Sequence, residues 1–84
     1  MEYDEDKVDD LTLALMHLVT FDESEAGARA WKGFDWDSLG RLHEKGLIGD
    51  PIGEAKSVVL TPEGVRRSKA LFDQHFGQRP TPAT

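Results

Sequence analysis

Glycine and proline interrupt the second half of the chain at fixed points, and these points constrain its fold more than any other feature. Thr61 is a residue type that caps helices, and Pro62 fits the first helical position, where no backbone N–H is needed. A helix is therefore predicted over 62–76. Gly46 favours the left-handed conformation that ends many helices, so an earlier helix is predicted over 35–45.

The segment between these two helices is predicted to form a β-hairpin. It starts with the apolar pair Leu47 and Ile48 and ends with the apolar run at 57–60. Glycine, aspartate and proline are frequent at 49–53, where they favour a turn. We therefore expect residues 47–48 to pair antiparallel with 57–60 around a long exposed tip.

Apolar residues recur at helical spacing near the N-terminus and predict a helix over 4–20. The stripe expected to face the core consists of Val8, Leu11, Leu15, Leu18 and Val19. Leu13 and Met16 lie off this stripe, so we expect them to be available for a second packing surface. The most buried side chains of the domain are predicted to include Leu15, Trp36, Leu39, Leu42, Val58, Leu60 and Phe72.

The segment 21–34 has a mixed pattern. Its alanines favour a helix, whereas Gly27 and Gly33 oppose one. One or two helical turns are predicted here, followed by a loop that places Trp31 and Phe34 on the core.

Together, these elements predict a mainly helical α+β domain over 1–76, with three to four helices and one β-hairpin. Because a helix is followed directly by the hairpin on a base of other helices, the expected architecture is winged-helix-like. The remaining residues, 77–84, contain two prolines and are predicted to form a disordered tail.

Two sequence stretches resemble known families of this architecture. LGRLHEKGLI at 39–48 and VVLTPEG at 58–64 resemble the recognition helix, wing and following helix of winged-helix regulators of the MarR and PadR families. The resemblance implies a fold more than a function, because the matched residues are caps, staples and core leucines.

A third stretch, AWKGFDWDSL at 30–39, is similar to a family of short, uncharacterised bacterial proteins known as a domain of unknown function. This similarity extends from Tyr3 to about Phe76, and it implies no activity, cofactor or partner.

Composition limits the possible chemistry and location. The chain has 84 residues and no cysteine, which excludes disulfides, thiolate metal sites and cysteine nucleophiles. The N-terminus is acidic and lacks an apolar run long enough for a signal peptide or a membrane span, so a cytoplasmic protein is expected. Residues 1–25 contain nine acidic side chains and one lysine, and the net charge is −6, which is unusual for a general polyanion binder.

No motif predicts catalysis, a cofactor or a metal site. The histidines stand on separate predicted helices, and no carboxylate accompanies them at metal-ligand spacing: they are His17, His43 and His75. The acidic pair Asp9 and Asp10 is predicted on a solvated helix face rather than in a cleft. We therefore do not expect an enzyme.

One hypothesis is that the protein is a DNA-binding regulator. Helix 35–45 would enter the major groove with Arg41 and Lys45, and Lys56 on the hairpin would contact phosphate. The acidic residues Asp37 and Glu44 make the outer face of this helix neutral, which weakens the hypothesis.

The preferred hypothesis is a protein-interaction module that associates with itself as a symmetric dimer through its first and last helices. The predicted apolar interface consists of Leu13, Met16 and Leu71. Arg66 and Arg67 would gain from facing an acidic cluster of the partner, formed by Asp6, Asp9 and Asp10, although the same charges could also pair within one chain.

Overall fold

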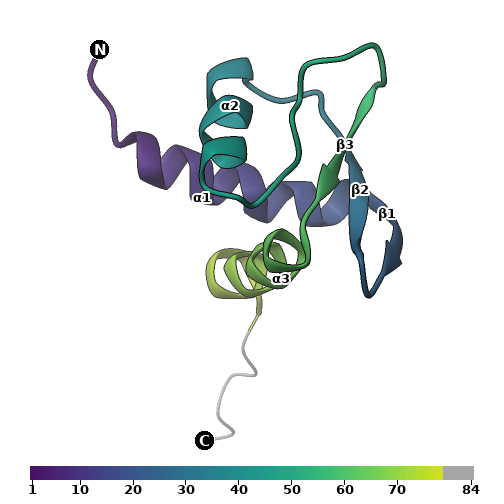
Figure 1. Ribbon diagram of the computed structural model, residues 1–84. Coiled ribbons are helices and arrows are strands. Elements are labelled where there is room, and N and C mark those ends of the chain that lie inside the picture. Colours follow the sequence, from purple (N-terminus) through teal and green to yellow (C-terminus); the bar gives the residue numbers. More distant parts are fainter. Residues whose placement is uncertain (79–84) are drawn as a thin grey trace, which may run out of the picture.

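The computed structural model describes residues 1–78, in which three α-helices pack against one side of a three-stranded antiparallel sheet (Figure 1). In chain order the elements are α1 (Glu5–Met16), the 3-10 turn η1 (His17–Val19), β1 (Thr20–Ser24), β2 (Gly27–Trp31), α2 (Trp36–Glu44), β3 (Ser57–Leu60) and α3 (Pro62–Phe76). Helix α1 runs between α2 and α3, and the sheet stands at its C-terminal end (Figure 1). Residues 79–84, on which most of the predicted disordered tail falls, lie outside the described part.

The boundaries predicted for α2 and α3 are confirmed, because local capping sets them. The Asp35 carboxylate accepts a hydrogen bond from the backbone N–H of Ser38 at 3.1 Å and starts α2. Gly46, which follows α2, has a φ of +75°. The Thr61 hydroxyl accepts a hydrogen bond from the N–H of Gly64 at 3.0 Å and starts α3.

The short helix predicted near 21–33 is wrong, because this segment forms the β1–β2 hairpin. Burial alternates along β2: Ala28 and Ala30 are buried, and Arg29 and Trp31 point to the other side. This period of two is the pattern of a strand with one covered face, and here it outweighs the helix propensity of alanine. No fourth α-helix occurs within residues 1–78.

Strand β3 takes β2 as its main partner, with four residues of each strand in register from Ala28↔Leu60 to Trp31↔Ser57. The predicted pairing with the 47–48 segment is confirmed at a single point, the antiparallel bridge between Ile48 and Leu60. The sheet therefore has the order β1-β2-β3, with the 47–49 segment along the outer edge of β3.

Helix α1 faces the opposite way from the prediction. Leu13 and Met16 have no exposed surface, whereas Leu15 is 41% and Leu18 is 66% exposed. Trp36 was also predicted to be buried and is instead 54% exposed. The prediction is confirmed for four of the remaining core residues, which are buried: Leu39, Leu42, Val58 and Leu60. Phe72 packs against this core and is partly exposed.

No helix within residues 1–78 has both the length and the apolar character required to cross a membrane.

The glycine at the end of the VVLTPEG stretch is needed for a close backbone approach. The Leu47 carbonyl accepts hydrogen bonds from the Thr61 backbone N–H and the Thr61 hydroxyl, each at 3.1 Å. These bonds hold the carbonyl against the first turn of α3, and a Cβ atom added to Gly64 would overlap it. Gly40, inside α2, has open space around the same position.

We therefore predict opposite effects for two glycine-to-alanine changes in helices. Gly64→Ala should lower the free energy of unfolding by about 1–3 kcal/mol, because the Leu47 carbonyl must move. Gly40→Ala should raise it by up to about 1 kcal/mol, because alanine favours a helix. Urea denaturation of the two variants checks this, and equal stability of both would contradict the packing described here.

Candidate interaction surfaces

A carboxylate lies buried at the centre of the helical part of the protein. The Asp9 side chain of α1 has no exposed surface. The Nε atom of Arg41 donates to both carboxylate oxygens, at 3.0 and 2.8 Å. The Lys45 ammonium group, one turn further along α2, donates to Asp9 Oδ2 at 3.0 Å. Two cations of α2 therefore bind one anion of α1. Asp9 was predicted on a solvated helix face, so its burial is a correction.

Further acidic groups of α1 surround the same two cations. Glu5 pairs with Arg41 at 2.8 Å, and Asp6 pairs with Lys45 at 3.0 Å. Ser38 also accepts a hydrogen bond from the Arg41 guanidinium group, at 3.3 Å. Arg41 and Lys45, which the sequence predicts on the outer face of α2, instead direct their side chains at α1.

The pKa values of these groups favour the ionised network. Burial favours the neutral form of Asp9, but the hydrogen bonds from Arg41 and Lys45 outweigh it and hold the pKa of Asp9 below its ordinary value of 3.8. Burial likewise opposes the charge of Lys45, yet its bonds to Asp6 and Asp9 raise its pKa. Hydrogen bonding to Asp9 raises the pKa of Arg41 as well.

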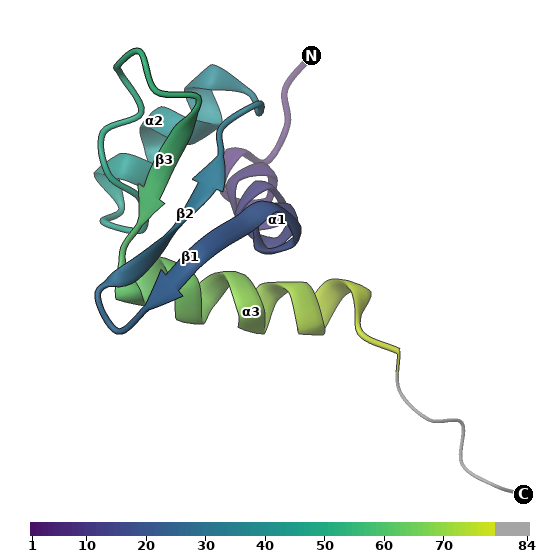
Figure 2. The ribbon, with the colours of Figure 1, turned by 90° about the vertical axis from the view of Figure 1, so that its right-hand side faces the viewer.

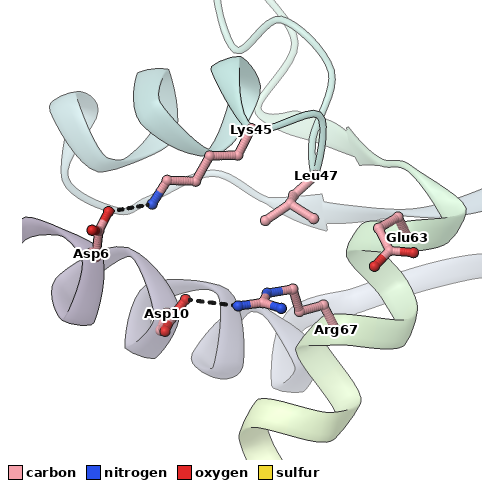
Figure 3. A pocket seen from close by; sticks show the side chains of 6 residues that line it. All are labelled: Asp6, Asp10, Lys45, Leu47, Glu63 and Arg67. Atoms are coloured by element: carbon pink, nitrogen blue, oxygen red, sulfur yellow. Dashed lines mark hydrogen bonds and ion pairs between the residues drawn. The ribbon is translucent and has the colours of Figure 1, made fainter.

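An open pocket of about 500 Å³ lies beside this network, between α1, α2 and α3 (Figure 3). Its lining residues are Asp6, Asp10, Lys45, Leu47, Glu63 and Arg67. The charges face one another across it: Lys45 reaches Asp6, and Arg67 lies 3.8 Å from Asp10 (Figure 3). Within residues 1–78, no group of three or more histidine, aspartate or glutamate side chains is arranged to hold a metal ion.

The apolar residues predicted to form a dimer interface are part of the core. Leu13 and Met16 have no exposed surface, and Leu71 is 7% exposed. The prediction that these three side chains form an exposed interface is wrong, because Leu13 and Met16 lie on the side of α1 that faces inward with Asp9, and Leu71 of α3 packs in the same core. Arg66 and Arg67 are exposed on α3 and pair within the chain, with Glu63 and Asp10 respectively.

Other apolar side chains of α1 face outward instead. Leu15 and Leu18, the latter in the turn η1 that continues α1, are well exposed, and Leu11 and Val8, one and two turns before Leu15, are partly exposed. Positions separated by three or four residues share one side of a helix. We refer to Val8, Leu11, Leu15 and Leu18 as the α1 stripe.

A second apolar surface lies on the sheet. In Figure 2 the strands stand in front of α1 and α2, so the face of the sheet toward the viewer carries no helix. The strand register places five side chains on this open sheet face: Phe21, Arg29, Trp31, Ser57 and Val59. Trp31 is 53% exposed and its ring lies 4.9 Å from that of Phe21, while Val59 is 40% exposed.

Among the residues that the structure describes, three cations at this end of the protein have no acidic partner. The Arg29 guanidinium group donates to the hydroxyl and the carbonyl of Ser57, at 2.9 and 3.3 Å. Lys32 donates to backbone carbonyls, and Lys56 is exposed. Within residues 1–78, Arg29, Lys32, Lys56 and Lys7 lack an ion-pair partner, and the first three belong to the β2–β3 end. Sequence reasoning missed this surface because it placed residues 21–33 in a helix and a loop.

The chain has recognisable relatives. A family described as a domain of unknown function (DUF6429) matches residues 4–78. Uncharacterized protein y4hR of Sinorhizobium fredii (strain NBRC 101917 / NGR234) is 55% identical over 76 residues, which cover 90% of this chain and 97% of that protein. No solved structure matches the chain. The expected membership in a family of unknown function is thereby confirmed.

The buried network generates a prediction on stability. Asp9→Asn removes the charge between Arg41 and Lys45 and should lower the free energy of unfolding by about 3–5 kcal/mol at neutral pH. The matched change Asp6→Asn, at a carboxylate that is 86% exposed, should have a much smaller effect.

The pH dependence follows from the sign of the pKa shift. Because folding lowers the pKa of Asp9, its contribution is fully present above the ordinary value of 3.8 and is lost as the pH falls through the lower folded value. The stability difference between the native sequence and Asp9→Asn should therefore shrink in acid. Urea denaturation between pH 7 and pH 2 measures it, and an Asp9→Asn protein as stable as Asp6→Asn at neutral pH would contradict the role given to Asp9.

Proposed function

The chain belongs to the family described as a domain of unknown function, DUF6429, and from its geometry we propose that it is a cytoplasmic, non-catalytic module that binds a protein partner. The contact surface is the open sheet face. One observation carries the proposal: Arg29 has no acidic partner within residues 1–78 and stands between Phe21 and Val59, with Trp31 beside it, on a protein of net charge −6.

The composition of this face supports protein recognition. Tryptophan and arginine dominate the binding energy of many interfaces, where each is removed from water at the centre of the contact. Trp31 is half exposed in the single chain. Because burial of a large aromatic side chain contributes strongly to association, a partner that covers Trp31 would gain affinity from it. Ser57 fixes the direction of the Arg29 guanidinium group, so little side-chain entropy is lost when a partner binds it.

Charge defines the class of partner. Most acidic side chains of the chain belong to its N-terminal region, and several of them neutralise Arg41, Lys45 and Arg67. The cations at the sheet end are left for an external anion. We infer that the partner presents an acidic segment that also contains aromatic or aliphatic side chains. Its carboxylates would bind Arg29, and its apolar side chains would pack on the Trp31 ring.

DNA binding has less support in this structure. Phosphate contacts supply most of the affinity of a DNA-binding protein, and Arg41 and Lys45 would first have to leave Glu5, Asp6 and Asp9. Lys56, which was predicted to contact phosphate, is exposed. The winged-helix relationship remains a proposal about α2, the following connection, β3 and α3, the elements that contain the 39–48 and 58–64 stretches.

A peptide selection tests the proposal. Peptides from a random displayed library should be enriched in aspartate or glutamate next to aromatic or aliphatic residues when selected on the immobilised protein. For the tightest peptide, Arg29→Ala and Trp31→Ala should each raise the dissociation constant by about 30-fold, which corresponds to a hot-spot energy of about 2 kcal/mol.

Arg66→Ala is the matched control, because Arg66 is an exposed arginine on α3, outside the sheet. It should leave the affinity unchanged. Selected peptides without acidic residues, or peptides whose binding ignores both Arg29→Ala and Trp31→Ala, would contradict the proposal. Binding of labelled duplex DNA at low salt that is lost in Lys56→Ala would favour the regulator hypothesis instead.

A further inference from the structure

We propose that a second copy of this chain packs along the α1 stripe, antiparallel to the first, and forms a two-fold symmetric dimer. The helix contact uses residues outside the open sheet face and goes beyond the proposed function. It replaces the interface of Leu13, Met16 and Leu71 that the sequence suggested and the core excludes.

The α1 stripe is an apolar surface that the fold leaves uncovered. Asp9 must face Arg41 and Lys45, and this fixes the rotation of α1 about its own axis. Leu15, on the far side of α1, and Leu18, in the turn η1 that follows it, consequently remain 41% and 66% exposed. Removing such leucine surface from water contributes about 25 cal/mol for each square ångström buried, and a small domain with a thin core gains from a second copy.

The spacing of the stripe suits a copy of itself. Val8, Leu11, Leu15 and Leu18 are separated by three, four and three residues, so the spacing reads the same in both directions. A two-fold axis between Leu11 and Leu15 places Leu11 against Leu15 of the second copy. The same axis places Val8 against Leu18 of the second copy. A symmetric dimer needs this self-complementarity, because one patch must fit itself.

Charge complementarity gives the pair its direction. The N-terminal arm, residues 1–4, precedes α1 and contains the acidic Glu2 and the exposed Tyr3. In one chain, the arm and the sheet lie at opposite ends of α1, so they do not meet (Figure 1). Antiparallel helices bring the arm of each copy past the C-terminal end of the other α1, where the sheet begins.

The arm of one copy then meets the open sheet face of the other. Glu2 supplies the carboxylate and Tyr3 the aromatic ring that the surface around Arg29 and Trp31 is proposed to bind. This second contact rests on the proposed function, whereas the helix contact does not. The arm of a second copy is therefore one occupant of the open sheet face.

Sedimentation measurements of the full chain between about 1 and 200 µM test the dimer. We expect the mass to rise to twice that of the monomer across this range. Leu18→Glu should raise the dimer dissociation constant at least 30-fold, because it places a charge in the helix contact. The matched control is Ile52→Glu, which alters a 75% exposed aliphatic residue between α2 and β3 and should leave the constant unchanged.

Circular dichroism establishes that each variant is folded, and Arg29→Glu separates the two contacts. It should weaken the dimer severalfold, and Glu2→Lys in the same protein should restore part of the loss. A chain that is monomeric at 100 µM would overturn the dimer and leave the peptide test of the open sheet face intact. Equal weakening by Leu18→Glu and Ile52→Glu would overturn the helix contact, and an Arg29→Glu dimer as tight as the original would overturn the arm contact.

Discussion

Asp9 carries a negative charge inside the protein, where Arg41 and Lys45 of α2 bind it from two successive turns. A buried carboxylate without such partners would be strongly unfavourable, so α1 has one acceptable rotation. That rotation turns Leu13 and Met16 into the core and leaves Leu15 and Leu18 outside. The ion pairs are thus an orienting device, whatever their net contribution to the free energy of unfolding.

The same network divides the protein into two electrostatic regions. On the helical side, acidic groups of α1 pair with Arg41 and Lys45 of α2, so both cations are already neutralised within the chain. At the sheet end, Arg29 and Lys56 lack acidic partners within the described residues and lie near the Phe21–Trp31 pair, of which Trp31 is exposed. The surfaces proposed for recognition, the open sheet face and the α1 stripe, are therefore what remains after the helices have packed and paired.

Sequence reasoning succeeded where structure depends on neighbouring residues. Asp35, Gly46 and the Thr61-Pro62 pair set the ends of α2 and α3, and each acts within a few residues of its own position. The rotation of α1 was not predictable in this way, because the chain offers apolar positions on both sides of the helix. The choice between them depends on ion pairs between residues more than thirty positions apart. Strand β2 was missed for a related reason: its alanines suit a helix locally, and pairing with β1 and β3 decides otherwise.

The ionisation of Asp9 is the most direct test of this account. A carbon-detected nuclear magnetic resonance titration of the side-chain carboxyl groups follows Asp9 separately from the exposed aspartates. If Arg41 and Lys45 hold it as described, its pKa lies below the ordinary value of 3.8. A pKa at or above that value is what burial alone would produce, and it would contradict the orientation of α1 on which the α1 stripe depends.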